Sequence, residues 1–313
     1  MYIGIDVGGM SIKAGLVSDE GKLIGKASVP SPLDSNESFC NAMYEAVKGA
    51  MEKGGCSSSI TAVGVGAPGT VDREKGYLVY SNNIPYKNAP VGEFLKEKLG
   101  VPVLVENDAN CAALGEYYAS EEAKNFVFIT LGTGVGGGIV INGKLFTGSN
   151  GAGGELGHIV THAGGRKCSC GRNGCWEAYA STSGLIKLTE ENREKLGLDS
   201  SSEISGRTAF DLMRSGNKEA KRVCDEWIEE VAVGITDVVN IFQPDEVVIG
   251  GAISKEGDTI LTPVISYVAE NEYLANQKDV KKAKIKASRA GNDAGIIGAA
   301  LLWKNKNEQE VLL

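Results

Sequence analysis

The segment FVFITLGTGVGGGIVINGKL, residues 126–145, governs the interpretation of the whole chain. Its apolar, β-branched ends, Phe126–Leu131 and Ile139–Ile141, predict two strands, with five glycines between them in residues 132–138. A glycine costs a strand about 0.5–1 kcal/mol relative to alanine, so the cluster needs a functional reason. A bend whose backbone N–H groups cradle a phosphate supplies that reason. The chain then continues as a strand, which distinguishes the segment from the G-x-G-x-x-G turn of dinucleotide-binding folds.

The first residues of the chain repeat this pattern. Tyr2–Asp6 predicts a strand, Gly8 and Gly9 form a bend, and Ile12–Val17 predicts the returning strand, followed by Gly-Lys-Leu in both copies. Two such hairpins, each opening a block of mixed strands and helices, predict a duplicated α/β architecture. We expect two domains, residues 1–118 with the C-terminal helix 294–313, and residues 119–293, with the functional site between them.

Hydrophobic spacing predicts several other elements. Apolar residues three and four apart predict a helix over residues 37–53. The polar, serine-rich stretch 189–207 is expected to be either a mobile loop or a solvated helix and turn. Further elements are strands at residues 62–66 and 101–106, a helix at 109–119 and a final apolar helix at about 294–304.

Composition narrows the class of protein. The chain has 313 residues, of which 42 are glycine, and is long enough for two domains with their own cores. Its formal net charge is −8, and no Lys/Arg stripe could follow a phosphate backbone, so nucleic acid is not an expected partner. No signal peptide or apolar span is recognisable, which predicts a cytoplasmic protein without a membrane partner. Seven cysteines in a reducing compartment are not expected to form a disulfide framework.

The bend Asp6-Val-Gly-Gly-Met-Ser-Ile-Lys13 has two interpretations. Asp6 at a strand end can act on hydrated Mg²⁺, Gly8 and Gly9 can present N–H groups to an anion, and Lys13 can screen phosphate charge. The same residues are also common in an ordinary turn. The second glycine-rich hairpin favours the phosphate-binding interpretation.

The run Glu106-Asn107-Asp108 follows a predicted strand and precedes a predicted helix. Asp108 could cap the free N–H groups of that helix. Alternatively, its carboxylate could accept a proton from a substrate hydroxyl. The sequence alone leaves both roles open.

The cysteines at 168, 170 and 175 form the most specific local pattern. Together with His158 they make a Cys₃His set, which suits a closed, structural Zn²⁺ site. His162 is a rival fourth ligand by proximity. Lys167 and Arg172 would favour thiolates even without a metal.

With these motifs in place, the chain resembles the sugar kinases of the ROK (repressor, open reading frame, kinase) family, most closely their bacterial glucokinases. The resemblance covers nearly the whole chain. Its motifs are Asp6-x-Gly-Gly, Gly66-Ala-Pro-Gly69, Glu106-Asn-Asp-Ala-Asn110, Leu131-Gly-Thr-Gly-x-Gly-Gly-Gly138, Gly154-Glu-x-Gly-His158 and Cys168-x-Cys-Gly-x-x-Gly-Cys-x-Glu177.

The resemblance implies a two-domain, actin-like (ribonuclease-H-like) fold that closes on MgATP and a hexose. It implies that Asp108 is the general base and that His158 serves both the sugar and the structural Zn²⁺. The implied sugar ligands are Gly66, Asn82, Asn83, Asn107, Asp108, Glu155, His158 and Glu177. The implied nucleotide-site residues are Asp6, Gly8, Gly9, Lys13, Gly132, Thr133, Gly134, Gly250 and Gly251. The implied zinc ligands are His158, Cys168, Cys170 and Cys175.

Glucose is the expected sugar, but the segment Ser81–Lys87 departs from the Asn-x-Pro-Gly-Trp motif of many glucokinases of this family. N-acetylmannosamine, mannose and fructose therefore stay as alternatives, and the phosphoryl donor could be polyphosphate or ADP. The family also implies a homodimer or homotetramer. A sugar-responsive repressor is disfavoured, because the first motif begins at Asp6 and leaves no residues for a helix-turn-helix domain. An actin-like ATPase without an acceptor would not need Glu155, His158 and Glu177.

Overall fold

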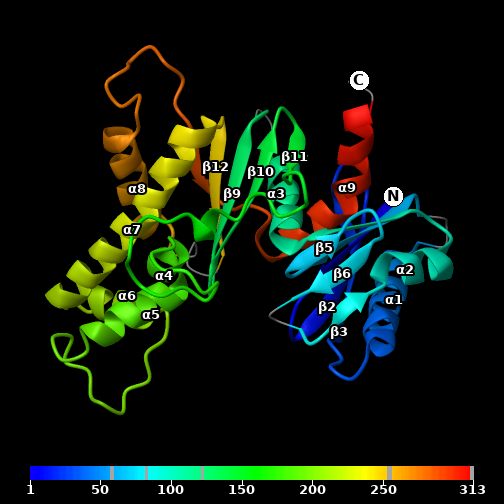
Figure 1. Ribbon diagram of the computed structural model, residues 1–313, viewed down its shortest axis with the longest axis horizontal. Helices are drawn as coiled ribbons and strands as arrows, with labels where there is room; N and C mark the ends of the chain where they lie inside the picture. Colours follow the sequence, from blue (N-terminus) through cyan, green and yellow to red (C-terminus); the bar gives the residue numbers. More distant parts are fainter. Residues whose placement is uncertain (57–59, 82–83, 121–122, 252–255, 311–313) are drawn as a thin grey trace. The chain divides into compact units, whose positions relative to one another are not determined.

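The computed structural model describes residues 1–56, 60–81, 84–120, 123–251 and 256–310 (Figure 1). The chain divides into two compact units. The first consists of Met1–Phe128, Gly138–Gly154 and Arg289–Leu313, and the second of Ile129–Gly137 and Glu155–Ser288. The domain boundaries expected at residues 118 and 293 stay a prediction.

The first unit is built on a five-stranded mixed sheet in the order β3-β2-β1-β4-β8. The antiparallel neighbours β1 and β2 confirm the predicted N-terminal hairpin, and β1, β4 and β8 run parallel. The register aligns Asp6 with Lys13 on one side and with Gly66 on the other. The strands are β1 (Tyr2–Val7), β2 (Ser11–Val17), β3 (Leu23–Pro30), β4 (Ala62–Ala67) and β8 (Val103–Asn107).

Helices cover both faces of this sheet. The buried side chains of α1 (Asn36–Lys53), among them Phe39 and Met43, join the apolar core formed by Ile3 and Ile5. Helix α9 (Ala294–Glu310) lies on the opposite face, where its backbone directly contacts the backbone of the sheet. The contact is so close that a Cβ on Gly4 or Gly64 would come within 1.8 Å of an α9 carbonyl oxygen.

The remaining elements of the first unit are small. Helix α3 packs closely on α9, since a Cβ on Gly298 would lie 1.7 Å from the Cys111 carbonyl oxygen. A three-stranded sheet with the order β5-β6-β7 was not expected from the sequence. These elements are α2 (Val91–Leu99), α3 (Asp108–Tyr118), β5 (Thr70–Asp72), β6 (Tyr77–Tyr80), β7 (Lys87–Ala89) and η3 (Gly291–Asp293).

A second five-stranded sheet has the order β11-β10-β9-β12-β13. If β9 is matched to β1, β10 to β2 and β11 to β3, the two sheets have the same strand order. This repetition confirms the predicted duplicated α/β architecture. The strands are β9 (Phe126–Leu131), β10 (Val135–Ile141), β11 (Lys144–Phe146), β12 (Glu246–Gly250) and β13 (Lys284–Ala287).

The helices of the second unit surround two buried tryptophans. The Trp176 indole donates to the Glu230 carbonyl on α7 at 2.7 Å, and the Trp227 indole donates to the Ser181 carbonyl at 3.1 Å. Each indole therefore has the partner that a buried N–H requires. The helices are η1 (Leu156–His158), α4 (Glu177–Ala180), α5 (Thr182–Glu191), α6 (Thr208–Arg214), α7 (Lys218–Phe242) and α8 (Asp258–Asn271).

The 189–207 stretch contains the end of α5 and a series of turns. The Arg193 guanidinium donates to the Ser202 carbonyl at 3.0 Å and also to the Asp199 carbonyl, which ties the turns together. The helix-and-turn interpretation therefore matches the structure. Over the described residues, no helix has both the length and the apolar character needed to cross a bilayer.

Candidate functional site

The N-terminal bend places Asp6 at the end of β1, beside Lys13 on β2. The Lys13 ammonium lies 3.5 Å from the Asp6 carboxylate. Burial raises the pKa of Asp6 above its ordinary value, and the charge of Lys13 opposes that rise. A partly buried carboxylate at a strand end can act on a hydrated cation.

The two glycines of this bend have different surroundings. The Gly8 N–H donates to the Ser11 carbonyl at 3.0 Å, and the Gly8 carbonyl accepts from the Ser31 hydroxyl at 2.6 Å. Gly9 is exposed at the tip. The N–H group of Gly8 therefore closes the turn in this structure, and its expected contact with phosphate stays a prediction.

Two charged residues that lie beside Asp6 were not predicted from the sequence to belong to this site. Lys26 on β3 forms an ion pair with Asp293, and both charges act on the Asp6 carboxylate. Gly295, at the start of α9, allows this close approach, since a Cβ there would lie 3.2 Å from Asp6 Oδ1.

The turn from β8 to α3 separates the two roles considered for Asp108. Asn107 is the N-cap, and its side-chain oxygen accepts from the N–H groups of Ala109 at 2.9 Å and Asn110 at 3.2 Å. The capping role considered for Asp108 is therefore wrong. Asp108 is the first helical residue, half-buried, with Oδ1 accepting from the Ala109 N–H at 2.9 Å.

Glu106 holds this turn in place. One carboxylate oxygen accepts from the Asn107 N–H at 2.8 Å and from the Asn110 amide at 2.9 Å, and the other pairs with Arg73. Arg73 also donates to the Thr147 hydroxyl. The Glu106 side chain is only 5% exposed. A glutamate within an apolar strand was the available signal, but its partner Arg73 could not be found from the sequence.

The residues of the Gly66–Gly69 motif lie next to the same turn. A Cβ on Gly66 would lie 3.1 Å from the Cys111 sulfur and 3.6 Å from the Asp108 Cα. The Asn107 amide donates to the Gly69 carbonyl at 3.2 Å. The structure thus brings Gly66, Asn107 and Asp108 together, whereas Asn82 and Asn83 lie outside the described residues.

In the second unit, residues 131–135, which we call the glycine loop, connect β9 to β10. The Gly132 N–H donates to the Gly134 carbonyl at 3.0 Å. Thr133 is exposed at the tip. Gly251, which follows β12 with a φ of 91°, lies against this loop, since a Cβ there would come within 2.2 Å of the Leu131 carbonyl oxygen. Gly250 is buried at the end of β12.

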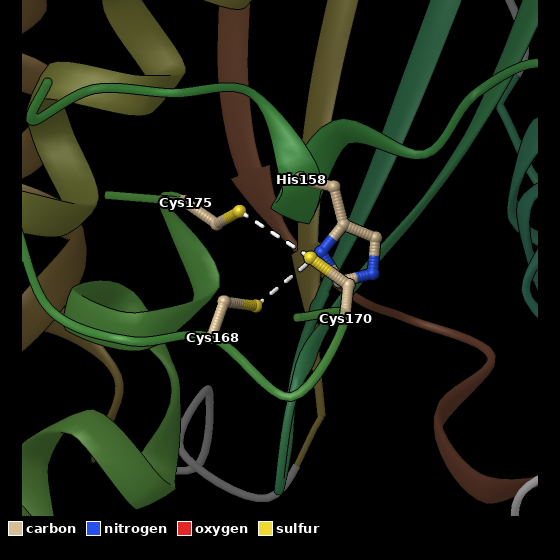
Figure 2. A group of neighbouring side chains, drawn as sticks. All are labelled: His158, Cys168, Cys170 and Cys175. Atoms are coloured by element: carbon tan, nitrogen blue, oxygen red, sulfur yellow. Dashed lines mark hydrogen bonds between the residues drawn. The ribbon is translucent and has the colours of Figure 1, made fainter. Parts of the chain in front are cut away.

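His158, Cys168, Cys170 and Cys175 converge on one point (Figure 2). Their potential ligand atoms all lie within 4.8 Å of one another. The Cys168 sulfur is 3.7 Å from His158 Nδ1, and the sulfurs of Cys170 and Cys175 are 3.6 Å apart. Tetrahedral Zn²⁺ with Zn–S bonds of about 2.3 Å separates two sulfurs by about 3.8 Å. The donor set and its spacing therefore fit zinc.

The surroundings of the three thiols differ. Burial raises the pKa of Cys168 to about 11, whereas the backbone N–H of Arg172 lowers the pKa of the exposed Cys170 to about 7. Zinc binds thiolates, so these values describe the protein without a metal.

His162 does not join this group. Its ring stacks on Tyr179 at 4.1 Å, its Nδ1 lies 3.1 Å from the Thr161 hydroxyl, and its Nε2 lies 3.5 Å from Glu230. Geometry thus favours His158, a choice that the sequence left open.

Glu155 and Glu177 lie before and after the cysteine-containing residues 168–175 in the chain. The Glu155 side chain is exposed, and its carbonyl accepts the His158 N–H at 3.1 Å to close η1. The Glu177 carboxylate accepts from the Val135 N–H at 3.0 Å and from the Ser169 hydroxyl at 3.0 Å. A carboxylate has about four acceptor positions, so these bonds leave room for a further donor.

Comparisons with known proteins agree over nearly the full length of the chain. A sequence model of the ROK family matches residues 2–306. The glucokinase of Halalkalibacterium halodurans is 34% identical over 320 residues, which cover 97% of this chain and 95% of that protein. The N-acetyl-D-glucosamine kinase of Haemophilus influenzae is 31% identical and covers 98% of this chain and 100% of its own.

Among solved structures, a ROK family glucokinase from Streptomyces griseus in complex with glucose and AMPPNP matches with a TM-score of 0.76. It is 35% identical, and the match covers 96% of this chain and 98% of that chain. This match, together with the repeated strand order, confirms the expected actin-like fold class.

Proposed function

The chain belongs to the ROK family, and we propose that it is a sugar kinase that transfers the γ-phosphoryl group of ATP to a hexose, with glucose as the favoured acceptor. One observation carries the catalytic part of the proposal. Asn107 supplies the cap of α3, so the half-buried Asp108 carboxylate is not required for that structural task. A carboxylate held at a strand-to-helix turn suits proton transfer from a substrate hydroxyl.

In this proposal Asp108 is the general base. A sugar hydroxyl would give its proton to Asp108 as its oxygen bonds to the γ-phosphorus and the bond from phosphorus to ADP breaks. Asn107 and Gly66, which lie beside Asp108, would contact the sugar. Glu155, His158 and Glu177 are proposed to bind other sugar hydroxyls.

The nucleotide is assigned to the glycine-rich bends. Bound MgATP would supply the phosphoryl group and the cation that offsets its charge. We assign the cation to Asp6 and the phosphates to the glycine loop and Lys13. The exposed Gly251 beside that loop supports an adenosine site there.

Zinc is proposed as a structural ion, held by His158, Cys168, Cys170 and Cys175. A site with four protein ligands leaves no open coordination position for chemistry. Its role would be to fold the loop that carries His158 and Glu177.

The proposal also includes the identity of the sugar acceptor and of the phosphoryl donor. The match to a glucokinase solved with glucose and AMPPNP supports glucose and ATP. The similar identity to an N-acetyl-D-glucosamine kinase supports testing N-acetylhexosamines as the second candidate. Mannose and fructose belong in the same panel, and polyphosphate and ADP should be tested as donors.

The test is a coupled ADP-release assay with ATP, Mg²⁺ and each sugar, on protein of measured zinc content. We expect strong stimulation by glucose, whereas ATP hydrolysis that is equal with and without sugar would refute the kinase proposal. Asp108→Asn should lower kcat by about 10²–10⁴-fold, with sugar binding retained in calorimetry. Asp279→Asn, at an exposed aspartate, is the matched control. Normal turnover by Asp108→Asn would show that another group is the base.

The proposed homodimer or homotetramer needs a separate measurement. Sedimentation at several protein concentrations should show a species of two or four chains. A monomer at all concentrations would contradict this expectation.

A further inference from the structure

The segment that directly follows the cysteines forms hydrogen bonds to the glycine loop. The Thr182 N–H, at the start of α5, donates to the Gly132 carbonyl at 2.8 Å. The Ser183 hydroxyl donates to the Thr133 carbonyl at 2.7 Å. The Val135 N–H donates to Glu177 Oε2 at 3.0 Å. Residues 177–183 thus contact the loop at three successive points.

Glu177 also contacts the loop formed by residues 168–175, which we call the cysteine loop. Its second oxygen, Oε1, accepts from the Ser169 hydroxyl at 3.0 Å and lies 3.7 Å from the Cys168 sulfur. Ser169 stands between two of the residues that converge in Figure 2. One carboxylate therefore joins two loops, one oxygen to each.

The identity of residue 134 fits this arrangement. A Cβ there would lie 2.3 Å from Glu177 Oε2, closer than any side chain can approach. A glycine at this position lets the carboxylate reach the Val135 N–H. The backbone at Glu177 is itself fixed, because the preceding Trp176 is fully buried and bonded to α7.

We propose that Glu177 is a positioning residue that makes the shape of the glycine loop, and so its affinity for nucleotide, depend on an ordered cysteine loop. This inference rests on the proposed function, which assigns ATP phosphates to the glycine loop. A bound zinc ion would order the cysteine loop and with it Ser169. Loss of zinc would then weaken nucleotide binding as well as sugar binding.

The first measurement is AMPPNP binding by calorimetry, without sugar or turnover, together with hydrogen exchange at the Val135 amide. A hydrogen bond to a charged group contributes enough to change an equilibrium by about tenfold or more. Glu177→Ala should therefore raise the Kd for AMPPNP by about tenfold and speed Val135 exchange by a similar factor. Removing zinc with a chelator should change both quantities in the same direction.

A conservative variant separates positioning from loss of the side chain. In Glu177→Gln the amide oxygen can still accept from Val135, and the amide nitrogen can donate to the Ser169 oxygen. Nucleotide affinity and Val135 exchange should therefore stay within about threefold of the wild type. Loss of both in Glu177→Gln, equal to the loss in Glu177→Ala, would overturn the positioning role.

Two further variants leave the identity of residue 177 unchanged and guard against a folding defect. Gly134→Ala should displace the carboxylate and reproduce the Glu177→Ala phenotype. Ser169→Ala should speed Val135 exchange more than Ser201→Ala, a control at an exposed serine. Zinc content and the far-ultraviolet circular dichroism of each variant are measured first.

Some outcomes separate this inference from the proposed function. Unchanged Val135 exchange in Glu177→Ala and Gly134→Ala would refute the coupling, even in an active sugar kinase. Faster exchange together with no sugar-stimulated ADP release would support the coupling and refute the proposed function.

Discussion

Replacement of Glu106 by glutamine tests whether the turn after β8 sets both stability and turnover. The carboxylate serves three donors: the Asn107 N–H, the Asn110 amide and Arg73. Glutamine has nearly the same shape, but one of its two side-chain ends can only donate. At least one of the three donors must therefore lose its acceptor.

The expected magnitude follows from burial. A hydrogen bond to a charged group contributes about 1.5–3 kcal/mol, and breaking a buried ion pair costs about 3–5 kcal/mol. Glu106 is 5% exposed, but Arg73 is 31% exposed, so water compensates part of the loss at the arginine. We therefore expect the free energy of unfolding to fall by about 2–3 kcal/mol. Because the Asn107 backbone leads directly into Asp108, we also expect kcat to fall by about tenfold, with a smaller change in KM.

Urea unfolding and the coupled sugar-kinase assay measure the two effects. Glu74→Gln changes a nearby exposed glutamate in the same way and should leave both quantities unchanged. If Glu106→Gln lost less than about 0.5 kcal/mol and kept its kcat, the view of Glu106 as the residue that holds the turn would be wrong.

Three further predictions concern other parts of the molecule. Cys175→Ala should abolish stoichiometric zinc binding and lower the Tm of the zinc-loaded protein, as measured by metal analysis and calorimetry; full zinc content would contradict the ligand assignment. Gly64→Ala places a Cβ 1.7 Å from the Ala299 carbonyl oxygen, so it should destabilise the first unit by several kcal/mol or prevent folding; a normal urea midpoint would show that α9 can shift away. Asp6 has a raised pKa because of burial, so the folded state binds its proton more tightly, and the stability that this proton contributes is lost as pH rises from about 3.8 through the folded pKa. Asp6→Asn should remove that pH-dependent loss from a series of unfolding curves, and an unchanged pH profile would rule out Asp6 as its source.

The elements that the sequence predicted well carry strong local signals. Helix α1 was expected at residues 37–53 and spans Asn36–Lys53, because its apolar residues repeat every three or four positions and Ser35 caps it. Both glycine-rich hairpins were predicted from β-branched runs on either side of a bend. The sheet of β5, β6 and β7 was missed, since strands of three or four residues contain too little periodicity.

The site was predicted where its residues are neighbours in sequence, and missed where they are not. The spacing of the cysteines indicated a metal site, and geometry then selected His158 because the stacking of His162 on Tyr179 turns that ring to other partners. By contrast, Arg73 meets Glu106 only through tertiary structure. The capping role was placed one residue too far along, because adjacent Asn and Asp are equally good caps and only the backbone geometry chooses between them.

The contact of α9 with Gly4 and Gly64 also bears on biosynthesis. Strand β1 ends at Val7, whereas the helix that covers one of its faces begins at Ala294 and is therefore translated much later. Until that helix emerges, no helix packs on one face of β1 and β4. The nascent chain then exposes a sheet surface that can make non-native contacts. We therefore expect the sheet of the first unit to complete its folding only after α9 has been translated. During that interval the nascent polypeptide is expected to depend on chaperones that shield the uncovered face.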